Sequence, residues 1–249
     1  MGDEVLPLNS SEALRYTGAP LRLNGARTSK DAAVTFPSYD RHQVFAPTSL
    51  NLRCLFHDSA IFDSRGSWRR AGFSVEGKGA KSDIMVASHP SAQGYLFKKY
   101  NVEISPGRQL KNYRCRIEGA QKLREFIGAR HLTRITVPEK YLYKLPPESC
   151  HDEEFCYVLI VERLTLLDSS QTKQLYRQID TETLKQLCTV LRVFSGLGSG
   201  ARNVPFTNGG QIAFVDTERW DETKEAPLRH LSPYLSKEKQ ELAEKILRK

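Results

Sequence analysis

Three short strand-like runs follow one another between residues 71 and 100, and they give the chain its clearest pattern. They are AGFSVE at 71–76, SDIMVAS at 82–88 and YLFKKY at 95–100, joined by the turn segments GKGAK and HPSAQG. Short runs of β-branched and aromatic residues bounded by Gly, Pro and Ser are typical of strands. The ordered part of the chain is therefore expected to begin with a sheet.

Helices and further strands are predicted after residue 100. Apolar residues recur at helical spacing within 112–129 and again within 181–197, where Thr181 is the expected N-cap. The segment 135–146 predicts one or two strands, 155–164 a buried strand, and 232–249 a capped amphipathic helix. Strands, a helix, strands and then helices with one short strand make an α+β chain.

Residues 1–66 carry a weaker signal. This stretch is rich in turn-forming residues and shows little periodicity. We expect an extended or partly ordered leader at 1–66, with a short strand near 50–57, followed by one domain at 67–249.

Composition and charge narrow the classes of partner. The net charge is +8, and residues 71–147 alone hold 14 Lys and Arg against 6 Asp and Glu. This segment is expected to attract a polyanion, such as nucleotide phosphates, nucleic acid, an inositol phosphate or an acidic membrane face, unless it is merely a solvated basic face. No apolar run approaches the roughly 18 residues of a membrane span.

The five cysteines and the N-terminus bear on the compartment. The cysteine count is odd and no CxxC pair occurs, which favours reduced thiols in the cytoplasm over a disulfide framework or a zinc site. The N-terminus lacks the apolar core of a secretory signal. Export as an effector by a route that needs no such signal stays open.

Two segments of the basic region have residues suited to phosphate binding. Gly77 and Gly79 lie between two strands, where glycine lets backbone N–H groups approach a phosphate, although a plain hairpin turn has the same appearance. Lys98 shares one strand face with Leu96 and is either a snorkelling lysine or a buried cation with phosphate and carboxylate partners. Glu118, or failing that Glu125, is the candidate carboxylate on the helix that follows.

A third segment offers oxygen ligands. Asn203 precedes a short strand, a tight turn and a second strand that ends at Asp216, with Glu218 two residues later. A hairpin of this length returns the Asn side chain to the Asp, and an amide oxygen beside a carboxylate suits Mg²⁺ with substrate phosphates. An ordinary polar hairpin is the alternative.

The order and spacing of these pieces resemble the protein kinase-like superfamily over about residues 72–220. Gly77 and Gly79 match its Gly-rich loop, and Lys98 matches the phosphate-binding lysine of its V-A-I-K strand. Glu118, 20 residues after Lys98, is similar to the helix-C glutamate. Asn203 and Asp216, 13 residues apart, resemble the two Mg²⁺ ligands.

The resemblance implies a fold and cofactors. It implies a two-lobed α+β fold, with an antiparallel-sheet N-lobe carrying one helix at about 67–161 and a reduced, mainly helical C-lobe at 162–249. It also implies ATP and Mg²⁺ as cofactors, adenine contacts from the backbone of Glu162 to Leu164, catalytic roles for Lys98, Glu118 and Asp216, and Glu218 as a helper at the metal.

The departures from the family pattern are informative. The pattern places a catalytic Asp five residues before the Asn, where this chain has Gly198. The metal motif is Asp-Thr-Glu, and only 29 residues follow Trp220. The chain therefore looks like a minimal, atypical member, either a small effector-type kinase with a degenerate catalytic loop or a pseudokinase scaffold.

Two alternatives of other classes remain. One is a basic module that binds nucleic acid or another polyanion without catalysis, with Tyr95, Phe97, Tyr100 and Tyr113 among the cations available for base stacking. The other is a regulatory protein that acts through a protein partner.

Overall fold

The computed structural model describes residues 47, 50–56, 62, 64–76, 84–100, 104–150 and 156–248, all within one compact unit, His42–Lys249. The described residues form six α-helices and a five-stranded antiparallel sheet, which confirms the predicted α+β class. The glycines of the predicted phosphate loop, Gly77 and Gly79, lie outside the described residues.

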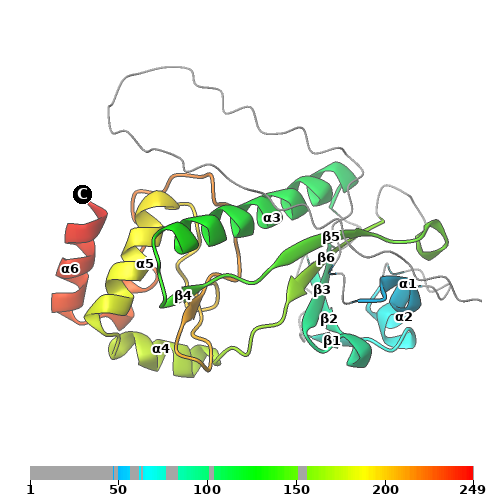
Figure 1. The fold of residues 1–249 in the computed structure, drawn as a ribbon, viewed down its shortest axis with the longest axis horizontal. Coiled ribbons are helices and arrows are strands. Elements are labelled where there is room, and N and C mark those ends of the chain that lie inside the picture. Colours follow the sequence, from blue (N-terminus) through cyan, green and yellow to red (C-terminus); the bar gives the residue numbers. More distant parts are fainter. Residues whose placement is uncertain are drawn as a thin grey trace, which may run out of the picture. The chain divides into compact units, whose positions relative to one another are not determined.

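The sheet carries the strand order β1-β2-β3-β6-β5, and every neighbouring pair is antiparallel. The 24-residue helix α3 (Pro106–Ala129) follows β3 in sequence, and in Figure 1 it leads from the sheet toward α5. The strands are β1 (Ser74–Glu76), β2 (Ile84–Ser88), β3 (Tyr95–Tyr100), β5 (Lys140–Lys144) and β6 (Tyr157–Glu162).

The two faces of the sheet have different chemistry. Phe97 is fully buried in an aromatic core on one face, with Val158 and Ile160 beside it. Lys98 points to the opposite face, because successive side chains alternate along a strand. Its cross-strand partners are Val86 and Leu159, and Leu159 packs in a cluster with Tyr113 of α3. The sheet thus presents Lys98 on its α3 side.

The described residues shortly before 67 belong to the same fold, since Leu52, Phe56 and Phe62 pack in the aromatic core of the sheet. The predicted strand near 50–57 is wrong, since Leu52–Phe56 form helix α1, and α2 follows at Arg65–Arg70. Figure 1 shows both helices beside the sheet. The Phe56 ring lies 5.7 Å from that of Phe97 and also contacts four further rings, those of Phe62, Trp68, Phe73 and Tyr143. The domain boundary expected at residue 67 therefore falls inside α2, and the folded part begins earlier.

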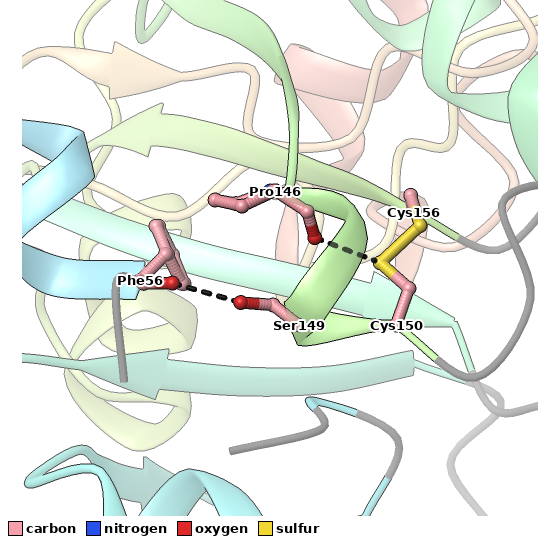
Figure 2. Close-up of a disulfide and its surroundings, with 5 residues drawn as sticks. All are labelled: Phe56, Pro146, Ser149, Cys150 and Cys156. Carbon is pink, nitrogen blue, oxygen red and sulfur yellow. Dashed lines mark hydrogen bonds between the residues drawn. A yellow bond between two sulfur atoms is a disulfide. The ribbon is translucent and has the colours of Figure 1, made fainter. Parts of the chain in front are cut away.

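Hydrogen bonds at Ser149, in the segment that follows β5, connect α1 to the sheet (Figure 2). The buried Ser149 hydroxyl donates to the carbonyl of Phe56 over 2.8 Å, and the N–H of Phe62 donates to the Ser149 carbonyl over 3.2 Å. Next to it, Cys150 and Cys156 form a disulfide. The expectation of reduced thiols throughout is wrong for this pair, whereas Cys54, Cys115 and Cys188 are free.

A second core lies at the other end of α3. Leu123 of α3 packs there with buried residues of α5 (Thr181–Val193) and of the short parallel pair β4 (Ile135–Thr136) and β7 (Ile212–Ala213). Asp180, not Thr181, caps α5 by accepting from the N–H of Thr183. Two more helices complete this part, α4 (Ser169–Arg177), which sequence analysis missed, and α6 (Lys237–Leu247).

None of the described helices is both long and apolar enough to cross a bilayer.

Replacing Phe56 tests whether α1 is part of the cooperative fold. We expect Phe56→Ala to lower the free energy of unfolding by about 3–5 kcal/mol, because a fully buried ring is lost from the aromatic core. Urea denaturation measures the change. Arg53→Ala, on the exposed side of the same helix, is the control and should change stability by less than about 0.5 kcal/mol. Equal stability of wild type and Phe56→Ala would contradict the assignment.

Candidate functional site

The hairpin predicted between Asn203 and Asp216 is present. The N–H of Val215 donates to the carbonyl of Asn203 over 3.1 Å, and that of Ala213 to Pro205 over 2.8 Å. Gly210, with φ +78°, supplies the left-handed residue of the turn. Asn203, Asp216 and Glu218 consequently line one groove, as the proposed metal ligands would have to.

Arg116 of α3 binds both carboxylates of this segment. Its Nη1 lies 2.8 Å from Asp216 Oδ1, its Nη2 pairs with Glu218, and its Nε donates to the Tyr100 hydroxyl over 3.3 Å. The Arg116 side chain is 13% exposed, against 39% for Asp216 and 27% for Glu218. Burial alone would lower the pKa of Arg116, but the two carboxylates and Tyr100 outweigh it and raise the value.

Residues 215–218, called the acidic segment below, are also held by hydrogen bonds to the Val215 carbonyl and to the Thr217 hydroxyl. The Thr217 hydroxyl donates to the carbonyl of Arg116 over 2.6 Å. The buried Lys140 ammonium donates to the Thr217 hydroxyl over 2.7 Å and to the Val215 carbonyl over 3.1 Å. Burial, with Lys98 and Arg116 nearby, holds the pKa of Lys140 well below its ordinary value.

Gly119 permits this close approach. A Cβ at position 119 would lie far inside contact distance of the Thr217 carbonyl oxygen and 2.7 Å from the Trp220 ring. Helix α3 and residues 217–220 therefore pack backbone to backbone at this point.

Lys98 lies near the same charged groups, and Lys98, Arg116, Lys140, Asp216 and Glu218 are called the charged cluster below. Burial lowers its pKa, the charge of Arg116 lowers it further, and Asp216 and Glu76 oppose the shift. Arg116 and Lys140 contact residues 215–218 directly, whereas for Lys98 only the effect of Arg116 and Asp216 on its pKa places it in their neighbourhood. The predicted pairing of Lys98 with the phosphate and metal site stays a prediction.

Glu118 does not have the predicted position beside Lys98. Within the described residues, no ion pair joins them, and Glu118 instead lies close enough to Cys115 to help raise the pKa of that thiol. The fallback, Glu125, accepts from Gln121 and Lys122 on the exposed side of α3. Arg116, two residues before Glu118 on α3, therefore contacts the acidic segment in place of a glutamate.

Gly198 stands where the family pattern has a catalytic Asp, and the structure gives it a packing role. A Cβ here would overlap Asn203 Nδ2 and lie 3.3 Å from its Cγ. The Asn203 amide therefore fills the space that a side chain at 198 would need.

At the end of β6, the backbone of Glu162 and Arg163 is hydrogen-bonded, whereas that of Leu164 is not in the described structure. The N–H of Glu162 donates to the Glu139 carbonyl over 2.9 Å, and that of Arg163 to Gly94 over 2.8 Å. Among the described residues, nothing hydrogen-bonds to the backbone of Leu164. An adenine contact there stays a prediction.

The aromatic residues proposed for base stacking are not available. Phe97 and Tyr113 are fully buried and Tyr100 is 5% exposed, so each belongs to a core. Only Tyr95 is partly accessible.

The sequence analysis missed two side chains that contact the acidic segment, Arg116 and Lys140. Arg116 meets Asp216 across 100 residues of sequence, and nothing in a helical pattern marks such a contact. In the described part of the chain, no group of three or more His, Cys, Asp or Glu side chains could hold a metal ion.

Comparison with known proteins does not assign the chain to a family. No model of a known protein family matches the chain, and no curated protein matches it significantly.

Two glycines of α3 make a matched test of the helix contact. We expect Gly119→Ala to lower the free energy of unfolding by about 1–3 kcal/mol, because the methyl group overlaps the Thr217 carbonyl. Gly128→Ala meets no atom within 4 Å and should stabilise α3 by up to about 1 kcal/mol. Urea denaturation of both variants compares them, and equal effects would refute the close packing.

Proposed function

We propose that this chain is a kinase-like protein that binds ATP and lacks the means for efficient phosphoryl transfer. The proposal rests mainly on one observation: Lys98 points to the α3 side of the sheet, where Arg116 of α3 binds Asp216 and both charges act on the pKa of Lys98. In protein kinases a lysine of the third strand and an aspartate after the catalytic loop act on the same nucleotide phosphates. Here Lys98 lies on the third strand of the sheet, and Asp216 ends the hairpin that begins at Asn203.

The arrangement of elements supports the same proposal. The sheet has five antiparallel strands, and one long helix, α3, follows the third strand in sequence. This helix packs near Lys98. The aromatic core under the sheet and the larger core around α5 are separate clusters, which suits a two-lobed fold. An open backbone at Leu164 suits an adenine contact.

The local chemistry favours binding over catalysis. Gly198 supplies no base, and Asn203 occupies the space beside it. Glu118 is not paired with Lys98, so the ion pair that positions the lysine in an active kinase is missing. A pseudokinase scaffold fits these features better than an atypical phosphotransferase.

The proposed metal ligands do not fit Mg²⁺ while Arg116 is bound to them. Both carboxylates already have a cationic partner, and a divalent ion between Asp216 and Glu218 would have to displace the guanidinium. Arg116 occupies these carboxylates, which leaves Lys98 as the cation proposed to bind the nucleotide phosphates.

ATP should stabilise the protein, and Lys98 should be needed for it. At ATP ten times the dissociation constant, linkage gives about 1.4 kcal/mol, a rise of about 3–6 °C in Tm for a chain of this size. We expect Lys98→Met to abolish the rise in a thermal-shift assay. Lys185→Met, an exposed lysine of α5, is the charge-matched control and should keep it. If the wild type shows no shift with ATP, with or without Mg²⁺, the proposal fails.

Magnesium dependence should appear when Arg116 is removed. In the wild type we expect the same ATP shift in EDTA and in MgCl₂, because Arg116 already occupies both carboxylates. In Arg116→Gln the carboxylates are left without it, so MgCl₂ alone should raise Tm, and EDTA should reverse the rise. That variant should also be less stable in EDTA, by about 1–3 kcal/mol given the partial exposure of the acids. A wild-type shift that needs Mg²⁺ would contradict this account.

A further inference from the structure

A broad groove lies next to the charged cluster and has a chemistry of its own. Its volume is about 1030 Å³, at the upper end of the size of small-molecule sites. Its walls are the loop 197–203, the end of the acidic segment, residues 224–230, and one side of α4 with Tyr234.

Basic side chains around the groove outnumber the acids that could neutralise them. Arg202 and Arg229 are exposed, and neither has a carboxylate partner among the described residues. Lys173 lies over the ring of Tyr234 at 5.5 Å, and Lys224 donates to the Gly196 carbonyl over 2.7 Å, so the contacts of neither ammonium are to a carboxylate.

The acids of the groove are mostly occupied. Asp216 and Glu218 are bound by Arg116, which leaves Glu225 as the remaining carboxylate of the lining. The groove is therefore positive overall.

The floor of the groove adds backbone donors. In the described structure, none of the N–H groups of residues 198–202 hydrogen-bonds to another residue, although the Gly200 carbonyl accepts from Asn203 over 2.7 Å and from Val204 over 3.1 Å. A Cβ at Gly200 would meet nothing within 4 Å, so a ligand can approach this stretch closely. Successive free N–H groups in a turn bind anions.

We propose that this groove binds a small phosphorylated molecule, with Arg202, Arg229 and the N–H groups of 198–202 as its phosphate ligands. The site adjoins the proposed nucleotide phosphates at Lys98, because Asp216 and Glu218 line this groove as well, but its own ligands, Arg202 and Arg229, do not require ATP. Where kinases place a catalytic carboxylate, this chain has a loop without acidic residues, which contains Arg202 and backbone N–H groups that are free to donate. A nucleic acid fits less well, because Tyr234, the one Phe, Tyr or Trp ring in the lining, is already covered by Lys173.

Calorimetric titration with pyrophosphate, free of divalent cations, tests the site. We expect the wild type to bind pyrophosphate and Arg202→Gln/Arg229→Gln to bind it at least tenfold more weakly. The control, Arg177→Gln/Arg192→Gln, removes two exposed arginines outside the groove and should stay within twofold of the wild type. Lys98→Met should bind pyrophosphate normally while losing its ATP shift, which separates this proposal from the previous one.

Three results would overturn the groove site. Loss of pyrophosphate binding in Lys98→Met but not in Arg202→Gln/Arg229→Gln would assign the anion to the nucleotide site alone. An equal loss in the control would indicate non-specific attraction. Retention of single-stranded RNA through Arg202 and Arg229, with no affinity for pyrophosphate, would make the groove a polyanion surface. The substituted arginines are exposed, so an unchanged Tm of each variant verifies folding.

Discussion

The paired contact of Arg116 with Asp216 and Glu218 joins the parts of this structure that lie far apart in sequence. One guanidinium from α3 meets the end of a hairpin 100 and 102 residues later. Two carboxylates one residue apart would repel each other without a cation between them, and a half-buried cation without carboxylates would be costly. Each partner therefore requires the other, and the hairpin, α3 and the Lys98 face of the sheet are held in one arrangement.

The elements that could be predicted are those whose pattern is local. The strand at Tyr95–Tyr100 has the predicted boundaries, because its residues alternate between two buried faces and turns flank it. Helix α1 was mistaken for a strand, since an aromatic and leucine-rich run of five residues suits either state and only its contacts with Trp68, Phe73 and Tyr143 decide. Helix α4 was missed because only two of its nine residues, Thr172 and Tyr176, are buried.

In the candidate site, too, local features could be predicted from the sequence and tertiary contacts could not. The Asn203–Asp216 hairpin followed from its length and its glycine turn, which are local. The choice between Glu118 and Arg116 depends on the rotation of α3 about its axis, which is fixed by the backbone contact at Gly119 and by the Tyr100 hydroxyl. Gly198 illustrates why one position cannot be interpreted alone. It appeared as a lost carboxylate, but its lack of a side chain is also what allows Asn203 its place.

The contact at Gly119 has a mechanical consequence. Two backbones that meet without intervening side chains cannot rotate or slide past each other without overlap, so α3 and residues 217–220 must shift as one body. A displacement of α3 would carry the acidic segment with it and leave its bonds to Arg116 intact. A force applied at the C-terminal end of α3, near Arg130, would therefore displace residues 217–220 together with the helix.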